Sequence, residues 1–163
     1  MKTTTCLLTA VLALLAAAPT VQAQYTFTLI ADDLSPTFAS FLGNPSINAG
    51  GTVAFWANRE AGAGGGSGIF TGTGGAATPI ALTTDPIFSS FSPAPSINAA
   101  GTVAFQATRT AGAGGGNGIF TNTGGPATPV ALSTDPIFSS LGDVTPINAA
   151  GTVAFQAEGD IGR

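Results

Sequence analysis

The residues of this chain that could carry out chemistry are few, and two of them occupy repeating positions. Asp85 and Asp135 stand 50 residues apart, and each is followed by a proline. A pair of carboxylates can hydrolyse a glycosidic bond without any histidine, and carboxylates also bind cations. Trp56 is the single tryptophan, and its flat apolar face suits a sugar ring. These three side chains are candidate ligand contacts, although turn formation for the aspartates and surface covering for the tryptophan are the structural interpretations that we favour.

The composition excludes most other catalytic chemistry. The chain has no histidine, and its single cysteine is Cys6, near the N-terminus. These absences exclude catalysis by a Ser-His-Asp triad or a Cys-His pair, and they exclude zinc binding by the usual ligands. The glycine-rich stretches 62–68 and 112–118 lack the spacing of a phosphate-binding loop, and no Lys-Ser/Thr pair follows them. We predict no enzyme activity, no catalytic residue, no metal site and no cofactor.

Three asparagines form the most regular polar series. Asn48, Asn98 and Asn148 recur every 50 residues, and a glycine follows three residues after each. An asparagine can bond its own backbone two residues on, and the glycine permits a positive φ, so the pattern predicts tight turns. A ring of ligand contacts is the alternative interpretation.

The first 23 residues have the layout of a signal peptide. Lys2 gives a positive start, residues 6–18 are apolar and uncharged, and small side chains precede a cut after Ala23. The apolar stretch is shorter than the roughly 20 residues that a spanning helix needs, and an uncleaved membrane anchor is the alternative. We predict a secreted or cell-surface protein with no membrane segment after cleavage.

Charge and hydrophobicity narrow the possible partners of the processed chain. Beyond residue 23, three arginines face eight carboxylates, which gives a net charge of −5. The chain therefore lacks the basic surface that binds nucleic acid. Charged residues are only 7% of the sequence and hydrophobic residues are 44%, which favours a packed core over disorder.

A 50-residue repeat organises the rest of the chain. Residues 36–85 (unit 1) and 86–135 (unit 2) align without a gap and are identical at 36 of 50 positions. Residues 136–163 (unit 3) begin another copy and stop after 28 residues. Residues 24–35, between the signal peptide and unit 1, are a predicted leading strand and connector.

Alternating apolar residues within each unit predict strands. In unit 1 we expect strands at 45–48, 52–58, 68–71 and 78–83. The leading strand expected at 25–31 corresponds by register to the end of a unit, the position of residues 81–84. Three to four short antiparallel strands make one β-propeller blade, so the predicted fold is all-β with propeller-type blades. About two and a half units make an incomplete propeller, whose open strand edges favour self-association. A β-solenoid is a less suitable alternative, because its coils are usually about 20–30 residues long.

The repeated motif also carries a family resemblance. The spacing Asn48-x-x-Gly51-x-x-Ala54-Phe55, with its copies at 98–105 and 148–155, resembles the bacterial tandem-repeat family named for NxxGxxAF. The resemblance implies a secreted protein of unassigned function, of the choice-of-anchor type associated with PEP-CTERM sorting tails. The unit is more distantly similar to the blade repeat of Tol-type six-bladed propellers. This sequence shows no sorting tail and its last unit is partial, so we expect a truncated fragment.

Two functional hypotheses follow from these observations. The first is a non-enzymatic extracellular repeat module that takes part in surface or structural interactions, with a glycan or a protein as partner. The second is a carbohydrate-binding or carbohydrate-active propeller that uses Trp56, Asp85 and Asp135.

Overall fold

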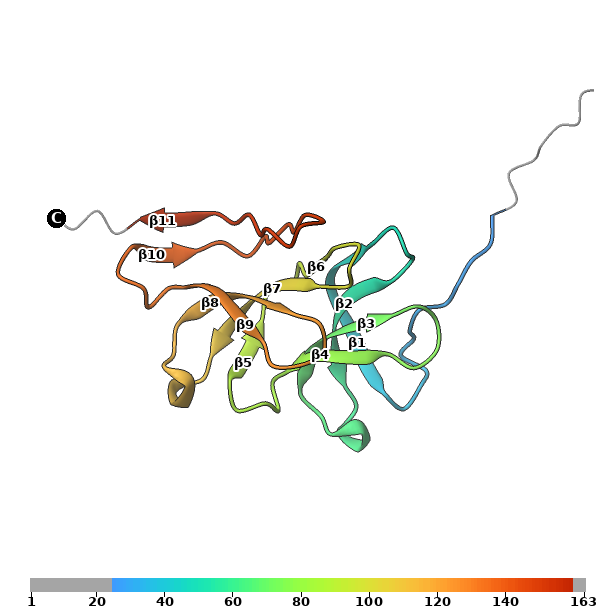
Figure 1. Ribbon diagram of the computed structural model, residues 1–163. Coiled ribbons are helices and arrows are strands. Elements are labelled where there is room, and N and C mark those ends of the chain that lie inside the picture. The colour runs from blue at the N-terminus through green and yellow to red at the C-terminus, as the bar shows by residue number, and fades with distance from the viewer. Residues whose placement is uncertain (1–24, 160–163) are drawn as a thin grey trace, which may run out of the picture.

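The computed structural model describes residues 25–159, so the predicted signal peptide at 1–23 lies outside the described residues. The described chain is all-β, as the sequence predicts, and its other regular elements are two short 3-10 turns, Ala61–Ala63 and Ala111–Ala113 (Figure 1). Between residues 25 and 159, no helix is long and apolar enough to cross a membrane. The strands are β1 (Phe38–Ile47), β2 (Val53–Arg59), β3 (Ser67–Gly72), β4 (Thr78–Leu82), β5 (Phe88–Phe91), β6 (Ser96–Ile97), β7 (Val103–Arg109), β8 (Asn117–Asn122), β9 (Thr128–Leu132), β10 (Phe138–Leu141) and β11 (Ala157–Gly159).

Each repeat unit forms its own antiparallel sheet. Unit 1 is a four-stranded meander in the order β1-β2-β3-β4, and unit 2 repeats it with β5 and β6 both paired to β7, followed by β8 and β9. In unit 3, β10 pairs with β11, and a bridge joins Ile147 to Val153. The first strand is continuous in unit 1 and divided in unit 2, where Pro93 replaces Gly43 and offers no N–H to the ladder.

Most of the strands predicted inside the units are confirmed, and two predictions are wrong. The first strand of unit 1 runs over Phe38–Ile47 rather than 45–48, because an irregularity in its pairing between Leu42 and Ser46 interrupts the alternation. The leading strand expected at 25–31 is not formed. Instead, Ile30 and Ala31 pack on the apolar face of unit 1 without joining a sheet.

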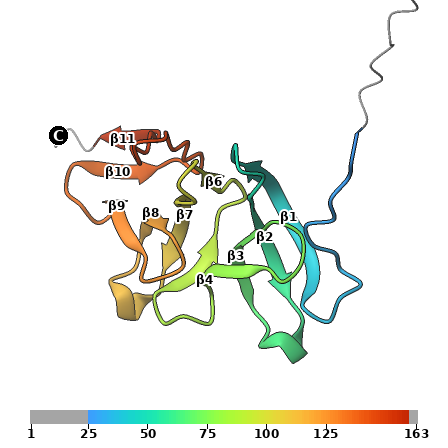
Figure 2. The same ribbon diagram turned by 45° about the vertical axis from the view of Figure 1, so that its right-hand side comes forward.

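The units pack face to face, in chain order, through equivalent residues (Figures 1 and 2). The face that a unit presents to the next unit is called its forward face, and the face toward the preceding unit is its rear face. One cluster joins the forward face of unit 1 to the rear face of unit 2; its members are Ala54, Ile69, Ile80, Ala81, Phe88, Phe91, Ile97, Val103, Phe105, Ala107 and Phe120. A smaller cluster joins units 2 and 3 through Ile119, Ala131 and Leu141, against which Phe138, Val153 and Phe155 pack.

A group of phenylalanines repeats its geometry from one unit to the next. The ring centroids of Phe38 and Phe70 are 5.0 Å apart with an interplanar angle of 80°. Those of Phe88 and Phe120, 50 residues later, are 5.1 Å apart at 84°. Such edge-to-face contacts add to the free energy of burying the rings. The repeat in sequence is therefore a repeat in packing.

The leading segment takes the place of a missing fourth strand. Ile30 and Ala31 lie 50 residues before Ile80 and Ala81. They pack against the rear face of unit 1, as Ile80 and Ala81 pack against the rear face of unit 2. Ile30 and Ala31 therefore act as the end of a preceding unit, as the sequence predicts, although they form no strand and correspond to Ile80 and Ala81 rather than to residues 81–84.

Candidate functional site

The asparagine turns are the most regular polar feature of the structure. The side-chain oxygen of Asn48 accepts hydrogen bonds from the backbone N–H of Gly50 and of Thr52, both at 3.0 Å. Asn98 holds its turn in the same way, with bonds of 3.0 Å from Ala100 and 2.9 Å from Thr102. The turn-forming role that the sequence predicts is confirmed.

The amide nitrogens of the same side chains link one unit to the next. Asn48 Nδ2 donates to the backbone carbonyl of Asn98 at 3.0 Å, and Asn98 Nδ2 donates to that of Asn148 at 3.1 Å. These bonds make an asparagine ladder, which runs in one direction through the three units. Asn98, in the middle, is only 5% exposed, so its hydrogen bonds are shielded from water.

The remaining positions of the motif have equally direct structural causes. Gly51 has a φ of 79°, a conformation that closes the turn and that glycine adopts without strain. Ala54 lies on the forward face and is fully buried by unit 2, which leaves no room for a larger side chain. Phe55 lies on the rear face, in the phenylalanine group of its own unit. The spacing Asn-x-x-Gly-x-x-Ala-Phe therefore encodes one turn and both packing faces.

The two candidate aspartates hold turns. A carboxylate oxygen of Asp85 accepts a hydrogen bond from the backbone N–H of Leu82 at 3.1 Å, and Asp135 accepts one from Leu132 at 3.2 Å. Each aspartate therefore closes the end of the fourth strand of its unit, as the structural interpretation predicts. Across residues 25–159, no group of three or more acidic, cysteine or histidine side chains is placed to hold a metal ion.

Trp56 lies between a packed core and an open groove. It is half-buried and packs against the core that joins units 1 and 2, and it also lines a groove on unit 1. Its indole N–H is buried, with no hydrogen-bond partner among the described residues. Asp85 lines a different groove, beside Gly124 and Gly125. The structure therefore does not bring Trp56 and Asp85 into one site.

The glycine-rich loops are ordered turns that wrap around an arginine. In unit 2, the side chain of Arg109 donates from Nε to the carbonyl of Gly115 at 2.8 Å. The backbone of Arg109 donates to Gly116 at 2.8 Å. Three successive glycines, Gly114 to Gly116, have positive φ, as do their equivalents in unit 1. In unit 2 the loop thus directs the carbonyl of Gly115 at the guanidinium of Arg109, whereas Nε of Arg59 in unit 1 is buried and has no hydrogen-bond partner among the described residues.

This conformation predicts the effect of adding a side chain to the loop. Replacing Gly115 by alanine should lower the free energy of unfolding by about 1 kcal/mol, since its φ is 63° although no atom lies within 4 Å of a new Cβ. Gly125→Ala is the matched control, because that site is equally open and its φ is not positive. Urea denaturation followed by circular dichroism checks the difference, and equal losses would contradict this explanation.

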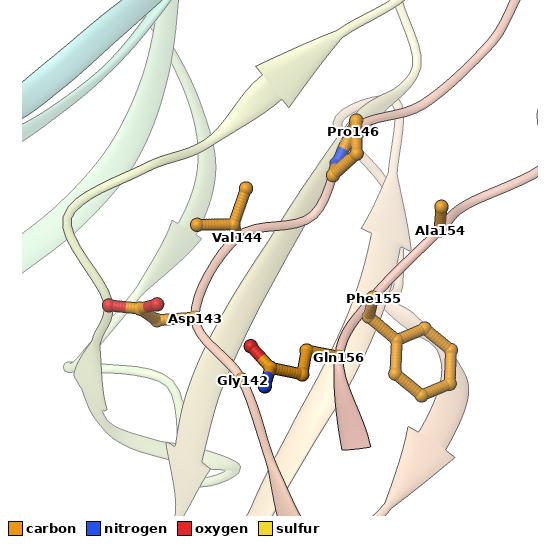
Figure 3. A pocket seen from close by; sticks show the side chains of 7 residues that line it. All are labelled: Gly142, Asp143, Val144, Pro146, Ala154, Phe155 and Gln156. Atoms are coloured by element: carbon orange, nitrogen blue, oxygen red, sulfur yellow. The ribbon is translucent and has the colours of Figure 1, made fainter.

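Two grooves lie at the two ends of the row of units. The first, on unit 1, has a volume of about 370 Å³ and is lined by Ile30, Ala31, Phe41, Leu42, Gly43, Pro45, Val53, Phe55 and Trp56. The second, on unit 3, has a volume of about 330 Å³ and is lined by Gly142, Asp143, Val144, Pro146, Ala154, Phe155 and Gln156 (Figure 3). Carboxylates are absent from the first lining and single in the second, so neither groove presents a pair of acids for glycoside hydrolysis.

A comparison with protein families shows to which family the chain belongs. The sequence matches a family of unknown function, DUF7453, over residues 16–161. The chain belongs to this DUF7453 family. No curated protein and no solved structure gives a significant match. The match to DUF7453 includes the leading segment and all three units, which are the parts that the structure joins into one packed row.

Sequence reasoning missed the contacts between units of this DUF7453 protein. Gln106 is buried and donates from Nε2 to the carbonyl of Leu141 at 2.8 Å, across the boundary between units 2 and 3. Its equivalent in unit 1 is Trp56, whose N–H finds no such partner. The change from Trp to Gln between copies indicates only a face that tolerates polar side chains. The sequence of one unit does not reveal which hydrogen-bond acceptor the next unit places against it.

Proposed function

We propose that this DUF7453 protein is a secreted, non-enzymatic repeat module that supports structural or surface interactions outside the cell. We infer that its units are propeller-type blades, and its repeated motif resembles that of the NxxGxxAF proteins associated with surface sorting. The main support is the asparagine ladder, because the most regular polar side chains of the chain are engaged in holding turns and in joining units. The signal-peptide layout of residues 1–23 supports export.

The candidate ligand residues support the same proposal. Asp85 and Asp135 bond the backbone of their own units, and Trp56 packs between unit 1 and unit 2. Residues used in this way contribute to the free energy of folding, and they leave few polar groups for a substrate. We therefore assign them to the scaffold.

Binding of polysaccharides to the processed chain tests this proposal against the carbohydrate hypothesis. We expect no reproducible binding on a glycan array or in a polysaccharide pull-down. Binding that Trp56→Ala abolishes, and that a variant in another exposed apolar residue (Ile137→Ala) retains, would overturn the assignment and favour a carbohydrate-binding propeller. Because Trp56 also packs in the core, circular dichroism of Trp56→Ala must first show that the variant is folded.

A further inference from the structure

The rear face of unit 1 exposes side chains that the next unit buries. Ile47 is 67% exposed and Phe41 is 41% exposed, whereas their equivalents in unit 2, Ile97 and Phe91, are 6% and 5% exposed. Ile97 and Phe91 are buried because the forward face of unit 1 lies on them. The leading segment covers only part of the rear face of unit 1, and the groove of about 370 Å³ is the part that it leaves open.

Among the described residues, nothing covers the forward face of unit 3. Ala54 and Ala104 are fully buried, Ala54 in the cluster with unit 2, whereas Ala154 is exposed. Gln106 is 8% exposed, whereas its equivalent Gln156 is exposed. Figure 3 shows Gln156 beside Gly142, with the ring of Phe155 on the other side of the strand, toward unit 2.

We propose that a second copy of this chain docks head to tail, with the forward face of unit 3 of one copy on the rear face of unit 1 of the next. The proposal rests on the scaffold function given above and names its partner. It is the continuation, between two molecules, of the interface that already joins units 1 and 2 and units 2 and 3.

The hydrogen bonds between units have a direction that permits this continuation. Within the chain, each asparagine amide donates to the backbone carbonyl of the next asparagine, and the series starts at Asn48 and reaches Asn148. In the docked pair, Asn148 Nδ2 of one copy meets the carbonyl of Asn48 in the other. By the same equivalence, the amide of Gln156 meets the carbonyl of Phe41, as Gln106 meets Leu141. The two open ends therefore carry matching donors and acceptors as well as apolar surface.

The leading segment makes the partial third unit a suitable partner. A complete forward face uses the second, third and fourth strands of a unit. Within the described residues, unit 3 supplies β10 and β11, which correspond to the first two strands, and Ile30 and Ala31 of the other copy already fill the position of the fourth strand. The docked copy therefore needs to cover Ile47. Its equivalent in unit 2, Ile97, lies on β6, which contacts β1 and β2, the first two strands of unit 1.

Single substitutions at each end test the proposal in the processed chain. We expect its average mass, measured by sedimentation and light scattering over about a hundred-fold range of concentration, to rise as the concentration increases. Ile47→Glu, on the rear face of unit 1, and Ala154→Arg, on the forward face of unit 3, should each hold the protein at the monomer mass. Both positions are exposed, so circular dichroism should show both variants folded. Ile137→Glu is the matched control, because Ile137 is 64% exposed and neither it nor its equivalent Ile87 belongs to the clusters that join the units.

Mixing the two blocked variants distinguishes head-to-tail docking from other kinds of association. The Ile47→Glu copy keeps an intact forward face and the Ala154→Arg copy keeps an intact rear face, so an equimolar mixture should form one-to-one dimers. Asn148→Asp keeps the oxygen that holds its turn and removes the amide donor, and it should weaken association about tenfold.

Three results would overturn the docking proposal. The first is a monomer at every concentration. The second is association that persists in both Ile47→Glu and Ala154→Arg, which is the result expected if the copies pair through strand edges. The third is a mixture of the two variants that stays monomeric. None of these results bears on the scaffold function, which polysaccharide binding tests separately. A heterologous contact of this kind closes into a ring or extends as a filament, and either product supports the docking.

Discussion

Replacing Phe105 by alanine is expected to lower the free energy of unfolding by about 3–5 kcal/mol, the largest single loss in the chain. Phe105 is fully buried, and its ring lies 5.8 Å from that of Phe88 and 5.9 Å from that of Phe120. It also belongs to the core that unit 1 and unit 2 share. The substitution therefore removes contacts inside one unit and across a boundary at the same time, and a rigid β-framework on two sides limits collapse of the cavity.

The equivalent residue of unit 3 provides the matched control for this prediction. Phe155 is half-buried and packs against a smaller cluster, so Phe155→Ala should cost no more than about half as much. Urea denaturation of both variants, followed by circular dichroism and by Trp56 fluorescence, measures the two losses. Similar losses would show that burial between units does not determine stability in this protein.

The contrast between Phe105 and Phe155 also shows what the sequence can and cannot predict. The two residues stand in the same motif, so sequence patterns place both on the same face of the same strand. Their burial differs because Phe105 packs against unit 1 and against Phe120 in the third strand of its own unit, whereas Phe155 meets part of unit 2 and the ring of Phe138. Periodicity identifies the face of a strand, whereas the other strands of the unit and the neighbouring unit together determine how deeply that face is buried.

Two other elements were predicted incorrectly for physical reasons. Residues 25–31 alternate like a strand, yet strand formation also needs an open edge to pair with, and here Ile30 and Ala31 contact a sheet face instead. The start of β1 was missed because Gly43, Asn44 and Pro45 lie inside it and are typical of turns. The pairing irregularity between Leu42 and Ser46 accommodates these three residues.

The sequence predicts the turn-forming role of the asparagines and misses the hydrogen bonds that their side chains make between units. The Asn-x-x-Gly spacing predicts a turn, because the side-chain oxygen and the glycine act within four residues of each other. The side-chain nitrogen of Asn48 acts on Asn98, 50 residues away, and no local pattern reports such a contact. The same holds for Gln106 and Leu141. In a repeat protein, the polar contacts between units follow from stacking the copies, which requires the structure.

Asn98→Ala is the second large effect, and we expect it to lower the free energy of unfolding by about 2–4 kcal/mol. The buried side chain accepts bonds from Ala100 and Thr102 and donates to the carbonyl of Asn148. The substitution leaves two backbone N–H groups and one carbonyl without these partners in a site shielded from water. Asn148→Ala is the matched control, and it should lower the free energy of unfolding by about 1 kcal/mol or less. Asn148 is exposed, and its side chain bonds only its own turn, through the backbone N–H of Thr152.

Asn98→Asp separates the contact between units from the turn. One oxygen of the introduced carboxyl keeps the two hydrogen bonds from Ala100 and Thr102. The second oxygen replaces Asn98 Nδ2, which is 3.1 Å from the carbonyl oxygen of Asn148, and therefore faces that carbonyl. Repulsion from the carbonyl and burial raise the pKa of that carboxyl above its unfolded value. The protonated carboxyl restores a hydrogen-bond donor, so it stabilises the fold at low pH. This stabilisation disappears as the pH rises through the raised pKa. The stability difference between the variant and the natural chain should therefore be smaller at about pH 4 than at about pH 7. Urea denaturation at both pH values measures it, and a difference independent of pH would show that the ladder contributes nothing across the boundary between units.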